Sequence, residues 1–548
     1  MTATMTRYQT AEPAGRDGFA QLLRSEWTKF RTVRGWKITL LVVLALTAAV
    51  PIWLASTATS NDPQTCTPQG CQVEGRSFAT GPAGTAVIDS FYFVHQAVGT
   101  SGSLTARVAD LHGTGKVDVS PGFGTPPTTE PWAKAGLIIK ASTKPGAAYA
   151  AIMLTGSHGV RMQYDFSHDQ AGPAAAASAA TWLRLTRSGD AITGWTSANG
   201  RSWSALGTVR LAGLPASAQA GLFVTSPDYT KGVGSGDNSV TATTQSTASF
   251  TGLALTGATA GGHWTGTAVG TNSAQVSVGP TTPGPAPDQS QTHVRQCLGG
   301  CAQTGSGYTR TAGRFTLTGT GDIAPFIPIV DPMHVAFLAT LFGLIAAIGL
   351  GVVFVTAEYR RSLIRLTVAA TPRRGRILVA KSIVVGGATF VAALIGAAIA
   401  FPVAGHELAK NGWKPPVWPD YSLLSSTGLQ VVLGTAAIAA GAAVLALAAG
   451  TLFRRSAGAV TAVIGLVVMP LVLSLVLPLT LATWLLRLTP AAAFTLQGTV
   501  PHYSQVSYNC APYHGCFPLD PWPGYAVLAA WALAALAGAV YLLRRRDV

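Results

Sequence analysis

Six apolar runs constrain the fold of this chain more than any other feature of its sequence. Each has roughly 20 residues or more, the length that an α-helix needs to cross a bilayer core of about 30 Å. They occupy residues 36–56, 333–357, 382–404, 424–452, 457–481 and 522–543. A chain that crosses lipid must satisfy its backbone hydrogen bonds internally, as an α-helix does. The runs therefore predict an α-helical polytopic membrane protein with six transmembrane helices.

The segment 358–381, between the second and third runs, sets the orientation of the chain. It has a single acid, Glu358, and a series of bases: Arg360, Arg361, Arg365, Arg373, Arg374, Arg376 and Lys381. Because Lys and Arg near span ends are retained on the cytoplasmic side, we expect this loop in the cytoplasm. The other basic clusters, in 7–37, 454–455 and 544–546, then fall on the same side. This predicts a multi-pass plasma-membrane protein with both termini cytoplasmic and membrane lipid as a partner.

A helical pattern begins this loop. Tyr359, Leu363 and Leu366 follow the i, i+4, i+7 spacing of one helix face. Pro372 ends the pattern, because its ring clashes with the preceding turn and it has no N–H. We expect a short amphipathic helix over 358–372, held at the inner membrane surface.

Residues 1–35 are expected to form a cytoplasmic tail and an interfacial helix. An apolar stripe recurs at helical spacing among basic residues, formed by Phe19, Leu22, Leu23, Trp27 and Phe30. Such a helix is typical of the membrane interface, and an ordinary surface helix is the alternative. The run 36–56 follows as the first span. A cleaved signal peptide is the alternative there, but the apolar run is longer than a signal peptide needs.

Residues 57–331 form a large insertion that this topology places outside. Its middle, about 78–255, consists of short alternating runs separated by turn signals such as Ala-Asn-Gly at 198–200. An Asn-Gly step tolerates the positive φ angles of a tight turn. Many short strands at this spacing predict an all-β sandwich. A Gly/Thr/Pro-rich segment at about 256–296 follows as a linker or a sandwich edge.

The six cysteines form three local pairs in segments expected outside: Cys66/Cys71, Cys297/Cys301 and Cys510/Cys516. Disulfides persist in oxidising compartments, so three short-loop disulfides are the expected state. A metal site is the alternative, although no His spacing accompanies any pair. The first two pairs could also exchange partners, which leaves the connectivity open.

Composition excludes several functional classes. The chain is 48% hydrophobic and 11% charged, whereas about 25% charged residues is usual in soluble domains. Its net charge is +15, but the bases flank apolar runs and are not interleaved with exposed aromatic residues, which excludes nucleic acid as a partner. No predicted span interior contains Asp, Glu, Lys or Arg, and this argues against an ion-coupled carrier.

Catalytic motifs are missing as well. Nothing fits the phosphate-binding pattern GxxxxGK[ST], so we expect any ATP and magnesium on a separate subunit. The insertion lacks the paired carboxylates of a glycosidase, since the cluster at 165–169 has the pattern of a solvated turn. Three tryptophans could stack on a sugar, although tryptophans of a sandwich more often belong to its core: Trp182, Trp195 and Trp203. We expect no enzyme activity and no bound metal or cofactor in this chain.

Two stretches resemble the permeases of actinobacterial ATP-binding-cassette (ABC) exporters of the type V, ABC-2-like kind. They are LLRSEWTKFRTVRGWK at 22–37 and TAEYRRSLIRLTVAATPRRGRILVAK at 356–381. In that family the loop between the second and third spans forms a coupling helix on the ATP-binding subunit. The resemblance implies that the residues making this contact are Glu358, Tyr359, Arg360, Arg361, Arg365, Arg373, Arg374 and Arg376.

The insertion departs from that family, many members of which have a short loop there. WAKAGLIIKAS at 132–142 and WLRLTRSGDAITGWTSANGRSW at 182–203 resemble a concanavalin-like jelly roll. The ExDxE motif of the glucanases is absent. The resemblance therefore implies a non-catalytic domain that recognises cargo, cell-wall material or a partner protein.

The leading hypothesis is the permease subunit of an ATP-driven exporter, which works as a homodimer or heterodimer of permeases with ATP-binding subunits. The alternative is a membrane-anchored binding or sensing protein, whose lectin-like sandwich binds cell-wall glycan or peptide without transport. Neither reading names the substrate.

Overall fold

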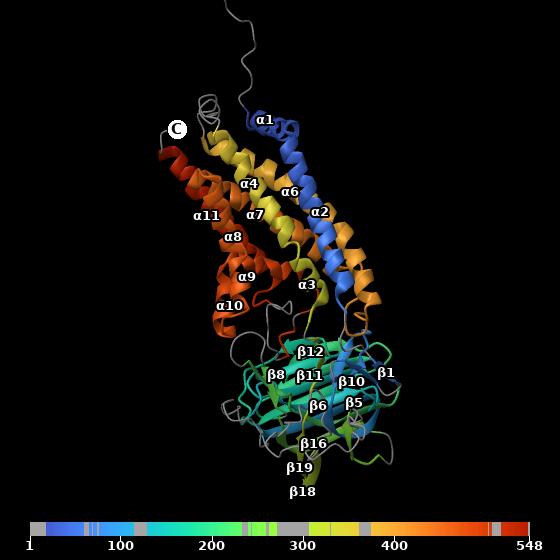
Figure 1. Ribbon diagram of the computed structural model, residues 1–548. Coiled ribbons are helices and arrows are strands. Elements are labelled where there is room, and N and C mark those ends of the chain that lie inside the picture. The colour runs from blue at the N-terminus through green and yellow to red at the C-terminus, as the bar shows by residue number, and fades with distance from the viewer. Residues whose placement is uncertain are drawn as a thin grey trace, which may run out of the picture.

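The computed structural model consists of a bundle of long helices and a β-domain at one end of it (Figure 1). The structure describes residues 18–59, 65–67, 70–73, 76–113, 129–232, 239–242, 244–258, 262–270, 306–328, 330–360, 374–501, 503–506 and 517–545. α1 (Phe19–Thr32) and the end of α11 (Pro521–Arg545) lie at the end of the bundle remote from the β-domain. We call this the far end, and the end beside the β-domain the near end.

Six helical segments in the described part of the chain are long and apolar enough to cross a membrane, as the sequence predicts. In chain order they are α2 (Arg34–Thr57), α3 (Pro332–Leu338) continuing into α4 (Leu341–Arg360), α6 (Arg374–Lys410), α7 (Ser426–Phe453), α8 (Ser456–Val467) with α9 (Met469–Ser474), and α11. The most apolar 18-residue stretch of each segment has a mean hydropathy of 2.2 to 2.5.

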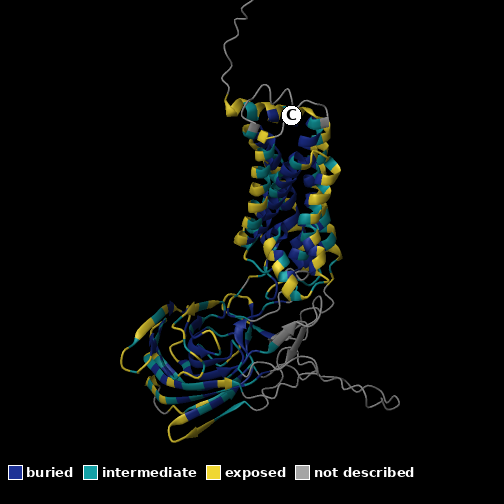
Figure 2. Ribbon diagram, turned by 90° about the vertical axis from the view of Figure 1, so that its left-hand side faces the viewer, coloured by how far each residue is buried: buried dark blue, intermediate teal, exposed yellow. Residues whose placement is uncertain are grey.

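α7 is the central helix of the bundle. In its most apolar stretch 72% of the residues are buried, against 22% in α2 and in α11. Small residues permit this packing: a Cβ added to Gly351 of α4 would collide with the carbonyl oxygen of Ala443, and one added to Gly441 would lie 3.0 Å from Leu528. Figure 2 shows the buried residues inside the bundle and the exposed ones on its outer helices. The close approach is what small residues between spans allow.

The fifth predicted span, 457–481, differs from one continuous helix. α8 ends at Val467, the short α9 carries Pro470, and the chain then turns into α10 (Leu479–Leu488) directly after Pro478. Proline lacks the N–H that an uninterrupted helix would need at these positions. α10 and the 3-10 helix η1 (Pro490–Gln497) meet at 96°. Every residue of η1 is buried, and it packs against α7 and α11.

The β-domain is a sandwich whose two layers belong to one large sheet, and the long strand β5 (Phe91–Gly113) contributes to both layers. The first part of β5 pairs with β13 (Ala218–Thr225) and β17 (Thr265–Val269), and its later part pairs with β10 (Thr181–Ser188) and β16 (Ser246–Ala258). The sheet continues from β13 through β6 (Lys134–Lys140), β7 (Tyr149–Thr155), β8 (Val160–Tyr164) and β9 (His168–Ala171). From β10 it continues through β11 (Ala191–Ser197) and β12 (Ser204–Arg210), while β19 (Arg314–Gly319) joins β16 to β18 (Gly307–Thr311).

Two apolar layers cover the β13–β8 sheet. The layer between the two halves of the folded sheet includes Leu104, Leu137 and Leu222. The layer on the other face includes Phe93 and Phe223, and β4 (Ala86–Asp89) and β20 (Ile323–Pro325) contribute to it. Because both faces are covered, every residue of β6 and β7 is buried. Short strands complete the domain: β1 (Thr65–Thr67), β2 (Gly70–Val73), β3 (Arg76–Thr80), β14 (Tyr229–Gly232) and β15 (Ser239–Ala242).

Candidate functional site: a charge network at the far end

Four charged side chains from three helices meet at the far end of the bundle. Glu26 and Lys29 come from α1, Glu358 from the last turn of α4, and Lys381 from the beginning of α6. Lys381 Nζ donates to Glu26 Oε2 at 2.7 Å and to Glu358 Oε1 at 2.6 Å. Lys29 Nζ lies 2.8 Å from Glu26 Oε1 and 3.4 Å from Glu358 Oε1. We call these four residues the charge network.

Three members of the charge network are removed from solvent. The side chain of Glu26 is 0% exposed, that of Lys381 2% and that of Glu358 11%, whereas Lys29 is 40% exposed. Two positive and two negative charges balance in the group. Removing one partner of a buried ion pair costs about 3–5 kcal/mol, because it leaves an uncompensated charge. The network therefore holds α1, α4 and α6 in one mutual arrangement.

Aromatic rings close the network on its apolar side. Lys381 Nζ lies 4.8 Å from the ring centroid of Phe354, within the range of a cation–π contact. Phe354 in turn packs edge-on against Trp36, with ring centroids 4.8 Å apart, and against Phe30 at 5.7 Å. These contacts join α1, α2 and α4 around the charged groups.

Burial and the neighbouring carboxylates act in opposite directions on the pKa of Lys29. Burial alone lowers the pKa of an amine, because it penalises the charged form. At Lys29 the hydrogen bond and charge of Glu26, together with the charge of Glu358, outweigh burial and raise the pKa above its usual value.

The structure revises the interpretation of 358–381. Glu358 and Lys381, expected in a basic loop, are buried within α4 and α6. The paired charges therefore lie toward the ends of two candidate spans, just outside the apolar runs 333–357 and 382–404. His334, fully buried in α3, also lies inside the predicted second span.

The other predicted coupling residues are only partly placed. Tyr359 is half-buried, and the guanidinium of Arg454 lies 5.6 Å from its ring centroid. Arg376 is exposed at the beginning of α6. Arg360 and Arg374 belong to the ends of α4 and α6, but their side chains lie outside the described part of the structure, as do Arg361, Arg365, Arg373 and the rest of the helix predicted over 358–372.

Glu26 is the member of the charge network that the sequence pattern did not single out. It lies within the apolar stripe of α1, between Leu23 and Phe30, and it is buried with Phe30. Phe19 and Trp27, which were assigned to the same stripe, are exposed. A single acid on the apolar face of an amphipathic helix was the available signal, since a carboxylate is buried only when it is paired.

The three tryptophans proposed for ligand stacking are half-buried on β10, on β11 and in the loop before β12: Trp182, Trp195 and Trp203. The Trp182 ring packs against Gly200, where an added Cβ would lie 2.9 Å from the ring. Trp195 Nε1 donates to Thr186 Oγ1 at 3.1 Å. The guanidinium of Arg184 lies 3.9 Å from the Trp203 ring centroid. All three rings thus make contacts within the domain.

For the predicted disulfides, the structure describes only the backbone of one cysteine pair. Cys66 and Cys71 stand directly opposite each other in the β1–β2 ladder, although the structure does not describe their side chains. The remaining four lie outside the described residues: Cys297, Cys301, Cys510 and Cys516. The three disulfides stay predictions.

The β-domain buries charge as well, on one strand. Lys134 Nζ lies 2.6 Å from Asp322 Oδ1, and Lys140 Nζ lies 2.6 Å from Asp89 Oδ2. Both lysine side chains are 0% exposed. Nearby, burial together with the charges of Asp228 and Asp322 raises the pKa of Glu130 to about 7.

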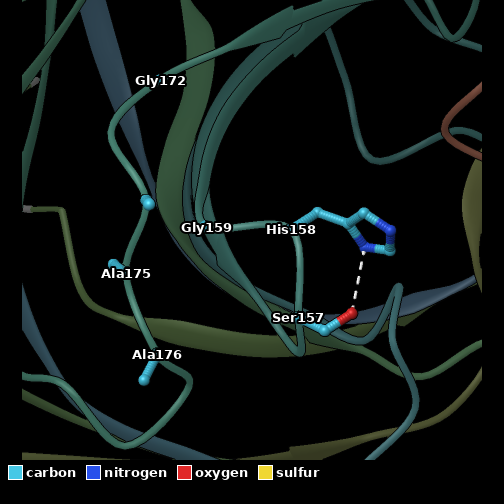
Figure 3. Close-up of a pocket in the computed structure, with 7 residues that line it drawn as sticks. Ser157, His158, Gly159, Gly172, Ala175 and Ala176 are labelled. Atoms are coloured by element: carbon cyan, nitrogen blue, oxygen red, sulfur yellow. Dashed lines mark hydrogen bonds between the residues drawn. The ribbon is translucent and has the colours of Figure 1, made fainter.

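A cavity of about 500 Å³ opens between the β7–β8 turn and the chain after β9 (Figure 3). His158 Nδ1 lies 3.1 Å from the carbonyl oxygen of Pro131 and 3.4 Å from Ser157 Oγ. Because a carbonyl only accepts, Nδ1 carries the proton and cannot take one from Ser157. The pair therefore lacks the geometry of a nucleophile and its base. Small residues form the remaining wall: Gly159, Gly172, Ala174, Ala175 and Ala176.

Comparisons with known proteins give no family for this chain. No protein-family model and no curated protein matches it. Among solved structures, scytalido-glutamic peptidase with a transition state analog inhibitor is 9% identical, covering 42% of this chain and 98% of that one with a TM-score of 0.24. A functionally unknown protein from Saccharomyces cerevisiae is 13% identical, with 38% and 98% covered and a TM-score of 0.22. The GH43 protein BlXynB of Bacillus licheniformis is 14% identical, with 28% and 26% covered and a TM-score of 0.17.

Proposed function

We propose that this chain is the permease subunit of an ATP-driven ABC exporter, which moves a substrate across the plasma membrane. The observation that supports this most is the charge network. Lys381 joins the end of α4 to the beginning of α6, the two helices that flank 361–373, and joins both to α1 through Glu26. A force on that loop would therefore act on three helices together.

In this mechanism the ATP-binding subunit binds ATP and Mg²⁺, and this chain transmits the movement. Docking of the ATP-binding subunit on the basic segment 361–373 displaces α4 and α6. α1 moves with them, because separating Glu26 from Lys381 would leave two buried charges without their partners. Such a coupled group of helices is the kind of discrete element that a two-state transporter requires. Two permeases with two ATP-binding subunits would form the complete exporter.

The alternative expected from the sequence is a membrane-anchored sensor with a lectin-like sandwich, in which three tryptophans are the candidates for stacking on a ligand. The Trp203 ring is covered by Arg184 and the Trp182 ring packs on Gly200. These contacts favour a structural role for the rings, so the exporter is the function we carry forward.

The test is co-purification of the tagged full-length chain from its native membrane, with bound proteins identified by mass spectrometry. We expect an ABC ATPase in near-equal amount. Replacing Arg361 and Arg365 by Glu should remove the ATPase, because the replacements reverse two charges at the proposed contact. The same double reversal at Arg201 and Arg210, both exposed in the β-domain, is the matched control and should retain it.

Either of two results would refute the proposal. The wild-type chain could copurify without any ATPase, or the ATPase could stay bound when Arg361 and Arg365 are reversed. Membrane insertion of each variant is checked by its extraction from washed membranes, so that loss of the partner is separated from loss of the protein.

A further inference from the structure

In the described part of the chain, the β-domain contacts the near end of the helices at two separate places. The first contact is apolar and lies against the loop between α6 and α7. It is a cluster of buried side chains that we call the hinge cluster: Phe78, Ala86, Phe326, Val417 and Trp418. The backbone N–H of Ala86 donates to the carbonyl oxygen of Pro416 at 3.0 Å, which joins β4 directly to that loop.

The hinge cluster is reinforced by the neighbouring chain. Trp418 Nε1 donates to the carbonyl oxygen of Val330, just before α3, and Trp413 Nε1 donates to that of Ala58, just after α2. The residue at the end of α2 and the residue before the N-cap of α3 are therefore both bonded to the loop that carries this cluster. Apolar burial together with these two hydrogen bonds makes this contact the one that is harder to separate.

Among the residues that the structure describes, the second contact is made by Gln505, in the segment after η1. Gln505 Nε2 donates to the carbonyl oxygens of Phe166 at 3.4 Å and Ser167 at 3.2 Å, in the turn between β8 and β9. Gln505 is only 2% exposed. Two hydrogen bonds of this length are individually weak compared with a buried apolar cluster.

The turn that receives Gln505 has an unusual backbone. Asp165 and Phe166 have φ angles of 44° and 66°, in the left-handed region that favours glycine. The Phe166 ring is 1% exposed and packs edge-on against Tyr149 at 4.9 Å. This packing fixes the turn with its carbonyl groups directed to Gln505. Backbone strain of this kind is maintained only where surrounding structure imposes it, and it gathers at sites that switch.

The segment carrying Gln505 is also tied to the helices. Asp331, the N-cap of α3, accepts hydrogen bonds from Thr499 Oγ1 at 2.7 Å and from the N–H of Val500 at 3.1 Å. Gln497, at the end of η1, donates to Thr340 Oγ1 and Thr435 Oγ1. The chain a few residues before Gln505 is therefore hydrogen-bonded to the N-cap of α3 and to α7.

We propose that the β-domain is a hinged lid on the near end of the helices, with the hinge cluster as its hinge and Gln505 as its latch. When the latch opens, the domain rotates about the hinge cluster and uncovers the near end beside η1. The contacts of the hinge and the latch lie within this chain, so the lid does not depend on an ATP-binding partner. Its role as the gate at the exit of the transport path rests on the proposed function.

The test measures two distances in the full-length protein in nanodiscs by electron–electron spin resonance. Spin labels on a keto amino acid leave the native cysteines untouched. One pair, at the exposed positions Ala171 and Leu488, reports the latch side; the other, at the exposed positions Thr85 and Lys410, reports the hinge side. Gln505→Ala should broaden the first distance distribution and move it to longer values, while the second stays as in the wild type. Ser504→Ala, at the neighbouring exposed position, is the matched control and should change neither.

Two results would overturn the lid. An unchanged Ala171–Leu488 distribution in Gln505→Ala would mean that Gln505 latches nothing. Broadening of both distributions together would mean that the domain has no hinge at the apolar cluster. Neither measurement requires an ATPase, so failure of the exporter proposal leaves this result intact, and failure of the lid leaves the copurification result intact.

Discussion

Both parts of the molecule bury lysine against carboxylate, but they hold the pairs in different frameworks. In the β-domain Lys134 and Lys140 lie on one strand, β6, whose backbone is hydrogen-bonded to β7 and β13 on either side. In the bundle Lys381 joins three separate helices that have no hydrogen-bonded ladder between them. A buried pair within a sheet stabilises an arrangement that the backbone already specifies. A buried pair between helices helps to specify the arrangement itself.

The largest expected effect comes from breaking the interhelical network. Lys381→Met leaves the carboxylates of Glu26 and Glu358 close together without their buried cation, so that only the partly exposed Lys29 remains beside them. We expect a destabilisation of about 3–5 kcal/mol, concentrated in α1 and in the ends of α4 and α6. Hydrogen exchange of the full-length protein in nanodiscs measures it: the amides of α1 should lose protection first.

The matched control for Lys381→Met is Arg376→Met, the same kind of change one and a half turns earlier in α6 at an exposed position. It should stay within about 0.5 kcal/mol of the wild type, as exposed substitutions usually do. Equal protection of α1 in the two variants would show that the charge network does not hold α1 to the bundle.

Lys140→Met makes the corresponding change in the sheet and sharpens the comparison. Asp89 loses its cation but keeps a hydrogen bond from the backbone N–H of Gly146. We expect a smaller loss, about 3 kcal/mol, and confined to the β-domain. Replacing Asp89 by Asn in the same chain should recover part of it, because the uncompensated charge is gone. Exchange at β6 and β7 measures both variants, and recovery of nothing would contradict the proposed cause.

The sequence predicted the broad architecture because apolar length and strand alternation are local signals. Six apolar helices and an inserted sandwich followed from runs of residues alone. The charge network did not, because Glu26 and Lys381 are 355 residues apart in the chain and only packing brings them together. Sequence alone groups Lys381 with the basic residues that precede it, the last of which is Arg376, and local composition does not reveal a partner on another helix. The Gln505 contact with the β8–β9 turn, 338 residues away, escaped prediction for the same reason.

The smallest expected effect is a pH dependence that only the β-domain should have. Glu130 is 5% exposed and its pKa is raised from 4.5 to about 7. The folded state therefore keeps the proton of Glu130 up to about pH 7, whereas the unfolded chain releases it near its usual pKa. The stability that this proton contributes is fully present at low pH and is lost as the pH rises through about 7, amounting to about 2 kcal/mol between pH 5 and pH 7. Glu130→Gln, which cannot ionise, should remove this part of the dependence and be the more stable form above pH 7. Exchange at β6 in the two proteins, compared at pH 5 and pH 7 after correction for the intrinsic rate, measures the difference. A dependence of the same size in Glu130→Gln would assign it to another group, and an accompanying change in α1 would contradict the independence of the two buried-charge systems.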